Sequence, residues 1–234
     1  MFYLIKRYII KTNLLNFGVF MSLIQGVITE NFILVGADKR GIRCTGEISE
    51  NCNKLIKYND DIIFGCTGGI LDNFKLFDGF CGYSDQTGLV HLDKQYDISY
   101  NNFVQQISSK FDLMYSEIQN DIKSYDIGSL IAGFNGKEFE ITTFGIGSED
   151  NEMDGIYHIH RSPSFPYKVI NFGKIEHMNK IDEMLSYQYQ VYGDLNIRQC
   201  KNIMLTVFNQ AAKTDNTINN KLVFAKIRKK DVVK

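Results

Sequence analysis

The chain has few of the residues that mark linkers, disulfide frameworks or metal sites. Its 234 residues include two prolines, at positions 163 and 166, and no low-complexity linker divides them, so we expect one domain. The cysteines are odd in number and form no Cys-x-x-Cys pair: Cys44, Cys52, Cys66, Cys81 and Cys200. This pattern argues against a disulfide framework and a zinc site, and it favours reduced thiols in a cytoplasmic protein.

An excess of either charge is also missing. With 26 Lys and Arg against 27 Asp and Glu, the chain has neither a basic field for nucleic acid nor an acidic tail. The apolar segment over residues 1–20 is interrupted by Lys11, Thr12, Asn13 and Asn16. These interruptions argue against a membrane span and a secretory signal, so we expect no nucleic-acid partner and no membrane partner.

Residues 1–21 precede the region where the other patterns begin. They fit a propeptide, a flexible amphipathic extension, or an upstream reading of a gene whose real start is Met21. We favour the last, because a Met-Ser start is a good substrate for removal of the initiator methionine. The expected division is a leader over residues 1–21 and a folded domain over residues 22–234.

Apolar periodicity predicts the secondary structure. The segment Leu23–Asp38 reads as a hairpin that turns at Glu30-Asn31, and Asn135-Gly136 predicts a second hairpin turn. Further strands are predicted at 42–44, 54–58, 62–66, 129–134, 139–145, 156–160, 167–172 and 222–227. Helical spacing predicts helices over 69–80, 101–122, 175–187 and 197–212. Helices grouped between runs of antiparallel strands indicate an α+β fold rather than a parallel βαβ fold.

Four positions in the first third of the chain follow a regular spacing. Ser22 stands sixteen residues before Asp38, Asp38 sixteen before Lys54, and Lys54 fourteen before the Gly68-Gly69 pair. Loss of the preceding methionine would expose Ser22 with a hydroxyl group and a free amine on adjacent carbons. That residue could then supply both a nucleophile and its base. A nearby carboxylate, ammonium group and glycine backbone would complete an amide-cleaving site.

These positions resemble those of the proteasome β-subunit family and its bacterial relative, the HslV peptidase, which are N-terminal nucleophile hydrolases. The matching segments need no gap between them: Ser22, Gly26-Val27, Val35-Gly36-Ala37-Asp38-Lys39-Arg40, Lys54 and Thr67-Gly68-Gly69-Ile70-Leu71-Asp72. The resemblance implies a four-layer αββα sandwich, with two antiparallel sheets between helical layers. It also implies peptide or unfolded-protein substrates, a ring-forming homo-oligomer, an unfoldase partner, and no cofactor or metal.

The resemblance further implies a role for each residue. Ser22 would be the nucleophile and its amine the base, Lys54 would lower the pKa of that amine, and Asp38 would keep Lys54 charged. Gly68 would offer its N–H group to the oxyanion, and Asp215 would hold the amine. From the residues alone, plainer interpretations stay open: a polar strand start, a surface lysine, a strand-end turn and a helix-capping glycine.

Six uncharged positions match those that line the primary specificity pocket of the family: Gly41, Cys52, Ile56, Cys66, Ile70 and Phe74. A pocket of this composition would favour apolar side chains beside the cleaved bond. Ordinary core packing explains the isoleucines and the phenylalanine equally well.

Several departures from the family pattern bear on activity. A serine replaces the family's threonine at residue 22, and Lys174 and Ile218 stand where the family has serines near the amine, although Thr217 could substitute for one of them. Two further interpretations therefore remain: a non-catalytic proteasome-like subunit with an assembly or binding role, and a small-amide amidase of the same superfamily. His158 and His160 share a strand face but have no third ligand at metal-binding spacing.

Overall fold

Strands from both ends of the described chain meet in one four-stranded sheet. The computed structural model describes residues 23–42, 47–68, 82–84, 89–92, 97–118, 127–146 and 155–229. All pairings in this sheet are antiparallel, in the order β12-β1-β2-β13. Its strands are β1 (Ile24–Thr29), β2 (Phe32–Asp38), β12 (Tyr167–Phe172) and β13 (Leu222–Arg228).

The hairpin predicted over residues 23–38 is confirmed by the pairing of β1 with β2. Its turn is closed by the Thr29 hydroxyl group, which accepts hydrogen bonds from the amides of Asn31 and Phe32. The second predicted turn, at Asn135-Gly136, is a four-residue loop between the paired Phe134 and Phe139. Gly136 has a φ of 94°, a conformation that costs glycine little because it has no Cβ.

A seven-stranded sheet has the order β11-β10-β9-β6-β5-β8-β7. Its strands are β5 (Leu55–Lys57), β6 (Ile62–Gly68), β7 (Gly82–Ser84), β8 (Val90–Leu92), β9 (Ile127–Phe134), β10 (Phe139–Ile146) and β11 (Gly155–His160). Strand β8 runs parallel to β5, which differs from the expected all-antiparallel pairing. The reason is that β8 joins the sheet beside β5 after an intervening segment, not through a hairpin. Two short strands, β3 (Gly41–Ile42) and β4 (Ile48–Ser49), pair separately.

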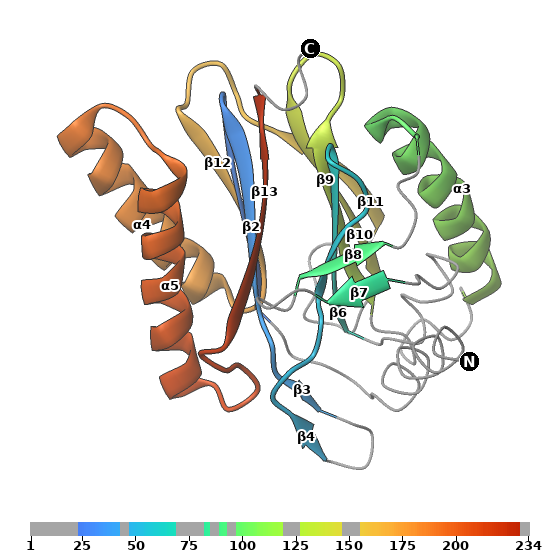
Figure 1. Cartoon of the computed structure of the whole chain (residues 1–234), viewed down its shortest axis with the longest axis horizontal. Helices are drawn as coiled ribbons and strands as arrows, with labels where there is room; N and C mark the ends of the chain where they lie inside the picture. The colour runs from blue at the N-terminus through green and yellow to red at the C-terminus, as the bar shows by residue number, and fades with distance from the viewer. Residues whose placement is uncertain are drawn as a thin grey trace.

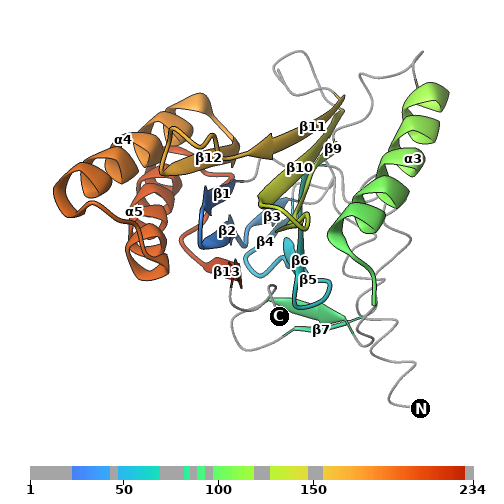
Figure 2. The ribbon, with the colours of Figure 1, turned by 90° about the horizontal axis from the view of Figure 1, so that it is seen from above.

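Three helices of the described residues lie outside the sheets. Figures 1 and 2 show α4 (Ile175–Tyr192) and α5 (Ile197–Thr214) against the four-stranded sheet, and α3 (Tyr100–Ile118) beyond the seven-stranded sheet. The helix predicted over 69–80 falls outside the described residues. The described elements combine helices and sheets, as the sequence predicts. No helix in the described part of the chain is both long and apolar enough to cross a bilayer.

Apolar side chains form three cores that follow this arrangement. The first core lies between the two large sheets and contains residues of both, including the fully buried Ile33, Leu55 and Leu130. Helix α3 contributes Phe103 and Phe111 to a core on the outer face of the larger sheet. Helices α4 and α5 form the third with β1 and β2. Because alternate residues of a strand point to opposite faces, β1 belongs to two cores at once.

The loops beside α4 and α5 place two charged residues at one end of the small sheet. Lys174 is the N-cap residue of α4, directly after β12, and Asp215 is the C-cap residue of α5, ahead of β13. The start of α5 is fixed by a capping box, in which Asn196 and Gln199 exchange side-chain and backbone hydrogen bonds. The start of α5 is thus set by its own sequence, whereas the side chain of Lys174 makes no capping hydrogen bond at the start of α4.

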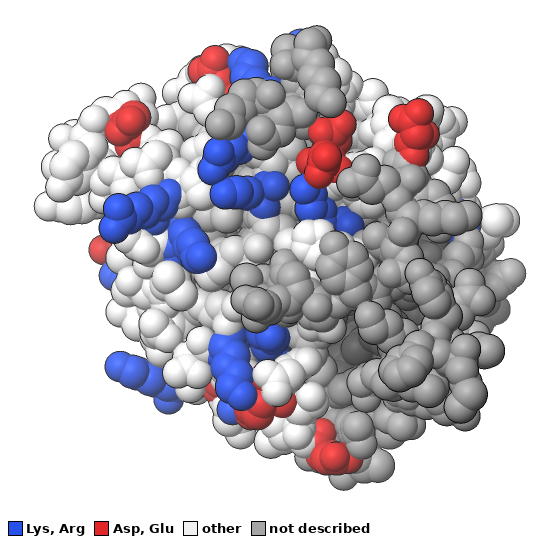
Figure 3. All heavy atoms as spheres, viewed as in Figure 1, with Lys and Arg blue, Asp and Glu red and all other residues white. Residues whose placement is uncertain are grey.

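Among the described strands, β13 is an outer strand of its sheet. It carries Lys226, which is exposed, and Arg228, which is half-buried. The ammonium group of Lys201 on α5 lies 4.9 Å from the ring centre of Phe224 on the same strand. Figure 3 shows Lys and Arg side chains gathered over the region that α5 and β13 occupy in Figure 1. Charged side chains on an outer strand discourage edge-to-edge pairing with another chain.

Gly133 in β9 offers a test of this packing. A Cβ atom there would overlap the ring of Tyr100 and lie 2.9 Å from the carbonyl oxygen of Asp61. We expect Gly133→Ala to lower the free energy of unfolding by about 3 kcal/mol, because neither group can move without disturbing the core. Gly128→Ala, in the same strand, meets nothing closer than 3.3 Å and serves as the matched control. Equal urea midpoints for the two variants would contradict this packing.

Candidate active site

The centre of the candidate site is a buried ion pair at the end of β2. The Lys54 ammonium group donates a hydrogen bond to Asp38 Oδ1 over 2.6 Å. The Asp38 side chain is fully shielded from solvent and that of Lys54 is 7% exposed. Lys54 directly precedes β5 and its carbonyl oxygen accepts from the amide of Cys66 on β6. The pair therefore joins the four-stranded sheet, which contains Asp38, to the seven-stranded sheet, which contains β5.

The same carboxylate also fixes the first described residue. The amide of Leu23 donates to Asp38 Oδ1 over 3.0 Å, and the amide of Asp38 donates to the Leu23 carbonyl oxygen over 3.1 Å. One oxygen of Asp38 thus accepts from Leu23 and from Lys54 together. Ser22 lies outside the described residues, and its carbonyl carbon is bonded to the Leu23 nitrogen that donates here.

Burial controls the ionisation of the groups around this pair. Loss of hydration lowers the pKa of Lys54, and the Asp38 carboxylate opposes that shift by favouring the ammonium form. Burial raises the pKa of Cys66 to about 12, although the nearby Lys54 charge acts in the other direction. The Cys66 thiol is therefore protonated near neutral pH, which excludes it as a ready nucleophile.

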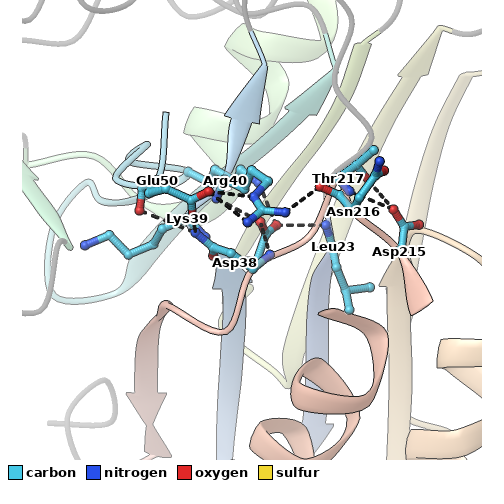
Figure 4. Close-up of polar contacts among 10 residues, drawn as sticks. Leu23, Asp38, Lys39, Arg40, Glu50, Asp215, Asn216 and Thr217 are labelled. Carbon is cyan, nitrogen blue, oxygen red and sulfur yellow. Dashed lines mark hydrogen bonds and ion pairs between the residues drawn. The ribbon is translucent and has the colours of Figure 1, made fainter. Parts of the chain in front are cut away.

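The second carboxylate oxygen of Asp38 also accepts hydrogen bonds (Figure 4). Its Oδ2 atom accepts from the amide of Arg40 over 2.9 Å and from that of Asn219 over 3.4 Å. Arg40 pairs with Glu50 at 2.8 Å and also donates to the carbonyl oxygen of Asn216. Asn219 donates to Glu50 over 2.6 Å, and this hydrogen bond, with the Arg40 charge, keeps the pKa of Glu50 below its usual value despite partial burial.

Sequence reasoning missed Glu50 and Asn219. They are separated from each other by 169 positions and fall in no periodic pattern. The sequence does carry a faint signal at one of them, because Asn219 lies four residues after Asp215, which matches an aspartate of the family.

Asp215 forms a separate polar group near the start of β1. Its Oδ1 atom accepts from the amide of Thr217 over 2.9 Å and also from the Thr217 hydroxyl group. Its Oδ2 atom lies 3.1 Å from the ammonium nitrogen of Lys174. Burial alone would raise the pKa of Asp215, but the Thr217 hydrogen bonds and the Lys174 charge outweigh it, so the pKa is lowered. Ile218, where the family has a serine, is buried in the core beneath α4 and α5.

A buried polar group links β1 to the start of α4. The fully buried Gln25 donates to the side chain of Asn171 over 3.0 Å and to the carbonyl oxygen of His177 over 3.4 Å. Burial lowers the pKa of His177, although Glu176 and Asp215 partly oppose the shift, so this imidazole is neutral at pH 7. These residues, which sequence reasoning also missed, tie the loop carrying Lys174 to β1.

The structure describes four of the six positions matched to a specificity pocket. Gly41 and Cys52 are buried, and Ile56 and Cys66 are partly buried against the core that α3 covers. Ile70 and Phe74 fall outside the described residues, as does Gly69. Gly68 is the last residue of β6, two positions beyond Cys66. A pocket role and ordinary packing both remain compatible with these positions, and the role of Gly68 stays a prediction.

His158 of β11 belongs to a different polar group. His158 Nδ1 lies 2.9 Å from Glu140 Oε1 and 3.0 Å from the Thr142 hydroxyl group, which in turn contacts the buried Tyr100 hydroxyl group at 2.8 Å. Within the described ranges, no cluster of three or more His, Cys, Asp or Glu side chains could hold a metal ion.

Removing the buried cation tests how much the Lys54–Asp38 pair contributes to the free energy of unfolding. We expect Lys54→Met to lower the free energy of unfolding by about 3 kcal/mol, because a shielded carboxylate is left without its counter-charge. Lys57→Met is the matched control, since Lys57 lies in the adjoining strand β5 and pairs at the surface with Asp60. An exposed ion pair contributes at most about 1 kcal/mol, so this variant should unfold at almost the wild-type urea concentration. Equal losses would show that burial of the Lys54 pair has no energetic consequence.

The lowered pKa of Asp215 predicts a pH dependence of stability. A carboxyl group with a lower pKa in the folded state stabilises the protein above its unfolded pKa of about 3.9, and this contribution is lost as the pH falls through the folded pKa. Asp215→Asn should therefore melt below wild type at pH 6, and the difference should shrink toward pH 3. The check is the melting temperature of both proteins over this range. A difference that grows on acidification would contradict the sign.

No sequence model of a protein family matches the chain, and no curated protein matches it in sequence. Comparison with solved structures gives a clear likeness. The chain is similar to the eukaryotic HslV of Trypanosoma brucei, with a TM-score of 0.54 and 12% sequence identity over 88% of this chain and 99% of that one. The chain therefore has an HslV-like fold.

Proposed function

We propose that this chain is a proteasome-type peptidase whose nucleophile is Ser22, exposed by removal of residues 1–21. The observation that carries the proposal is the shared oxygen of Asp38, which accepts both from buried Lys54 and from the amide that follows Ser22. A cation is thereby held within two hydrogen bonds of the residue bonded to Ser22. The HslV-like fold supports the same assignment.

The proposed reaction uses Ser22 as nucleophile and base together. The neutral α-amine takes the hydroxyl proton as the oxygen attacks the amide carbonyl, and the proton then passes to the leaving amine. Water hydrolyses the resulting ester and restores the hydroxyl group. An α-amine has a pKa of about 7.7–8.0, so the Lys54 charge need lower it only modestly to give a useful neutral fraction at pH 7. Lys54 also favours the developing alkoxide.

The oxyanion and substrate sites complete the proposal. Gly68 would donate its N–H group to the oxyanion, a contact whose loss typically raises a barrier by about 3–4 kcal/mol. The uncharged positions Gly41, Cys52, Ile56 and Cys66, with Ile70 and Phe74, would favour apolar side chains beside the cleaved bond. We further propose a four-layer αββα arrangement, assembly into a ring and unfolded protein chains as substrates.

One observation favours a second candidate, a non-catalytic subunit that uses the fold for assembly. Lys174 occupies an oxygen of Asp215 and Ile218 is buried, whereas the family has serines at both positions. If the Ser22 amine needs those hydroxyl groups, the chain would fold and assemble without cleaving peptides. Measured turnover separates the two candidates.

The decisive measurement is peptide hydrolysis by a chain that begins at Ser22. Such a chain is obtained from a fusion whose cleavage leaves no extra residue, and intact mass verifies its start. We expect it to hydrolyse short fluorogenic peptides with an apolar residue before the cleaved bond. Ser22→Ala should lower kcat at least about 1,000-fold because the nucleophile is lost, and Lys54→Ala should cause a comparable loss.

Two controls make the result specific. Lys57→Ala removes a surface charge from the adjoining strand and should leave turnover unchanged. One glycine added before Ser22 keeps the hydroxyl group but converts the amine to an amide, so turnover should vanish. Activity that survives this addition, or equal turnover in wild type and Ser22→Ala, would refute the mechanism.

A further inference from the structure

The described residues of α5 and β13 form a positively charged surface, which we call the basic face. It consists of Arg198 and Lys201 on α5 and of Lys226 and Arg228 on β13. The Lys201 ammonium group lies 4.9 Å from the ring centre of Phe224. Because alternate residues of a strand share a side, Phe224, Lys226 and Arg228 follow one another beside α5. Figure 3 shows Lys and Arg side chains gathered over this region.

The basic face is not neutralised by the described part of the chain. Arg198, Lys201 and Lys226 are exposed, and α5 contains no Asp or Glu. Among the described residues, none of the four cations has a carboxylate at ion-pair distance, and the buried Nε atom of Arg228 has no hydrogen-bond partner. These charges are thus left uncompensated by the residues that the structure describes.

Uncharged, exposed side chains lie next to the basic face at the end of α4. Tyr187, Val191 and Tyr192 are each more than half exposed, and residues 184–193 include no charged side chain. Gly193 ends this helix, and Arg198 follows in the first turn of α5. Tyrosine and arginine are enriched where proteins contact one another. The composition of this surface therefore favours contact with a protein.

The opposite charge is concentrated in another part of the same chain. Residues 195–234 contain nine Lys and Arg against two Asp, whereas residues 60–154 contain five Lys and Arg against seventeen Asp and Glu. The described elements of the acidic segment are α3 and strands β6 to β10. Figures 1 and 2 show α3 and α5 on opposite sides of the molecule, so contact between these two sides needs two copies.

We propose that the basic face is a contact surface for a second copy of this chain and docks against an acidic surface of that copy. Because two different surfaces meet, the contact is head-to-tail, and its repetition with a fixed rotation closes a ring. The inference rests on the proposed function for ring assembly and names a surface that forms the contact. Side chains make this contact, so no pairing at the edge of β13 is needed.

The physical reason is charge complementarity between copies. Opposite charges across a contact steer the encounter and fix its register, and like charges on a wrong surface oppose it. The charges of the basic face are mostly exposed, and salt screens exposed charges over distances of about 8–10 Å at ordinary ionic strength. Assembly through this surface should therefore weaken as salt is added.

The test compares the full chain with two triple variants by sedimentation velocity over a range of protein concentrations, at low and at high salt. The first variant removes exposed cations of the basic face: Arg198→Gln, Lys201→Gln and Lys226→Gln. These side chains are exposed, so the urea midpoint of this variant should stay near that of wild type.

A matched control removes three lysines that lie elsewhere: Lys57→Gln, Lys137→Gln and Lys180→Gln. Lys57 lies in β5, Lys137 in the turn between β9 and β10, and Lys180 in α4. The control has the same net charge as the basic-face variant. A difference between the two variants therefore reports the position of the charges and not their total.

We expect wild type to self-associate at low salt, and the basic-face variant to need at least about a tenfold higher concentration for the same assembly. The control should associate like wild type. High salt should weaken the assembly of wild type more than that of the basic-face variant. Mixed with isotope-labelled wild type, the basic-face variant should enter complexes seen by native mass spectrometry, because its acidic surface is intact.

A wild-type chain that stays monomeric at low salt overturns the inference, as does equal weakening of the two triple variants. Absence of the basic-face variant from mixed complexes contradicts a head-to-tail contact. If the basic-face variant instead loses binding to a single-stranded DNA oligonucleotide while its self-association is unchanged, the surface belongs to nucleic acid and the proposal is refuted.

Peptide hydrolysis is measured separately, on the chain that begins at Ser22. Assembly through the basic face without turnover supports the inference and refutes the proposed peptidase. Turnover in a chain whose assembly is insensitive to the basic-face substitutions refutes the inference and leaves the peptidase standing, so the two failures are distinguishable.

Discussion

A carboxylate with no access to water has to be neutralised by the protein, and the structure around Asp38 follows from that requirement. Transfer of such a charge into the interior costs several kcal/mol even after the protein relaxes. Lys54 supplies the counter-charge, while the amides of Leu23, Arg40 and Asn219 supply hydrogen bonds. These donors come from the start of β1, the end of β2, the approach to β5 and the approach to β13. One side chain thus fixes the relative positions of four segments.

That constraint also explains why a stabilising contact and the proposed catalytic arrangement coincide. Burial lowers the pKa of Lys54, and the adjacent Asp38 carboxylate is the main group that opposes this shift and favours the charged form. The amide of Leu23 shares the same acceptor oxygen, so the cation is held next to the chain that leads to Ser22. The surrounding Arg40–Glu50 pair satisfies its own charges, which limits its effect on the centre.

The sequence allowed a larger part of the fold to be predicted than of the polar site. Apolar alternation located the β1–β2 hairpin and β12, and helical spacing located α4 and α5, because these patterns record burial directly. Strands β7 and β8, of three residues each, were not predicted. Asp38 and Lys54 could be selected because their spacing matched a family. Glu50 and Asn219 could not, because their contacts join distant segments and leave no local pattern.

Lys174 shows how a sequence departure can be judged only with geometry. Compared position by position, a lysine in place of a serine reads as the loss of a hydroxyl group near the amine. In the structure, that lysine begins α4 and reaches an aspartate at the end of α5, so the two helices are joined where the small sheet ends. Thr217, one position before the expected serine, donates its hydroxyl group to the same aspartate. Both oxygens of this aspartate are thus satisfied by a lysine and a threonine, at and next to the positions where serines were expected.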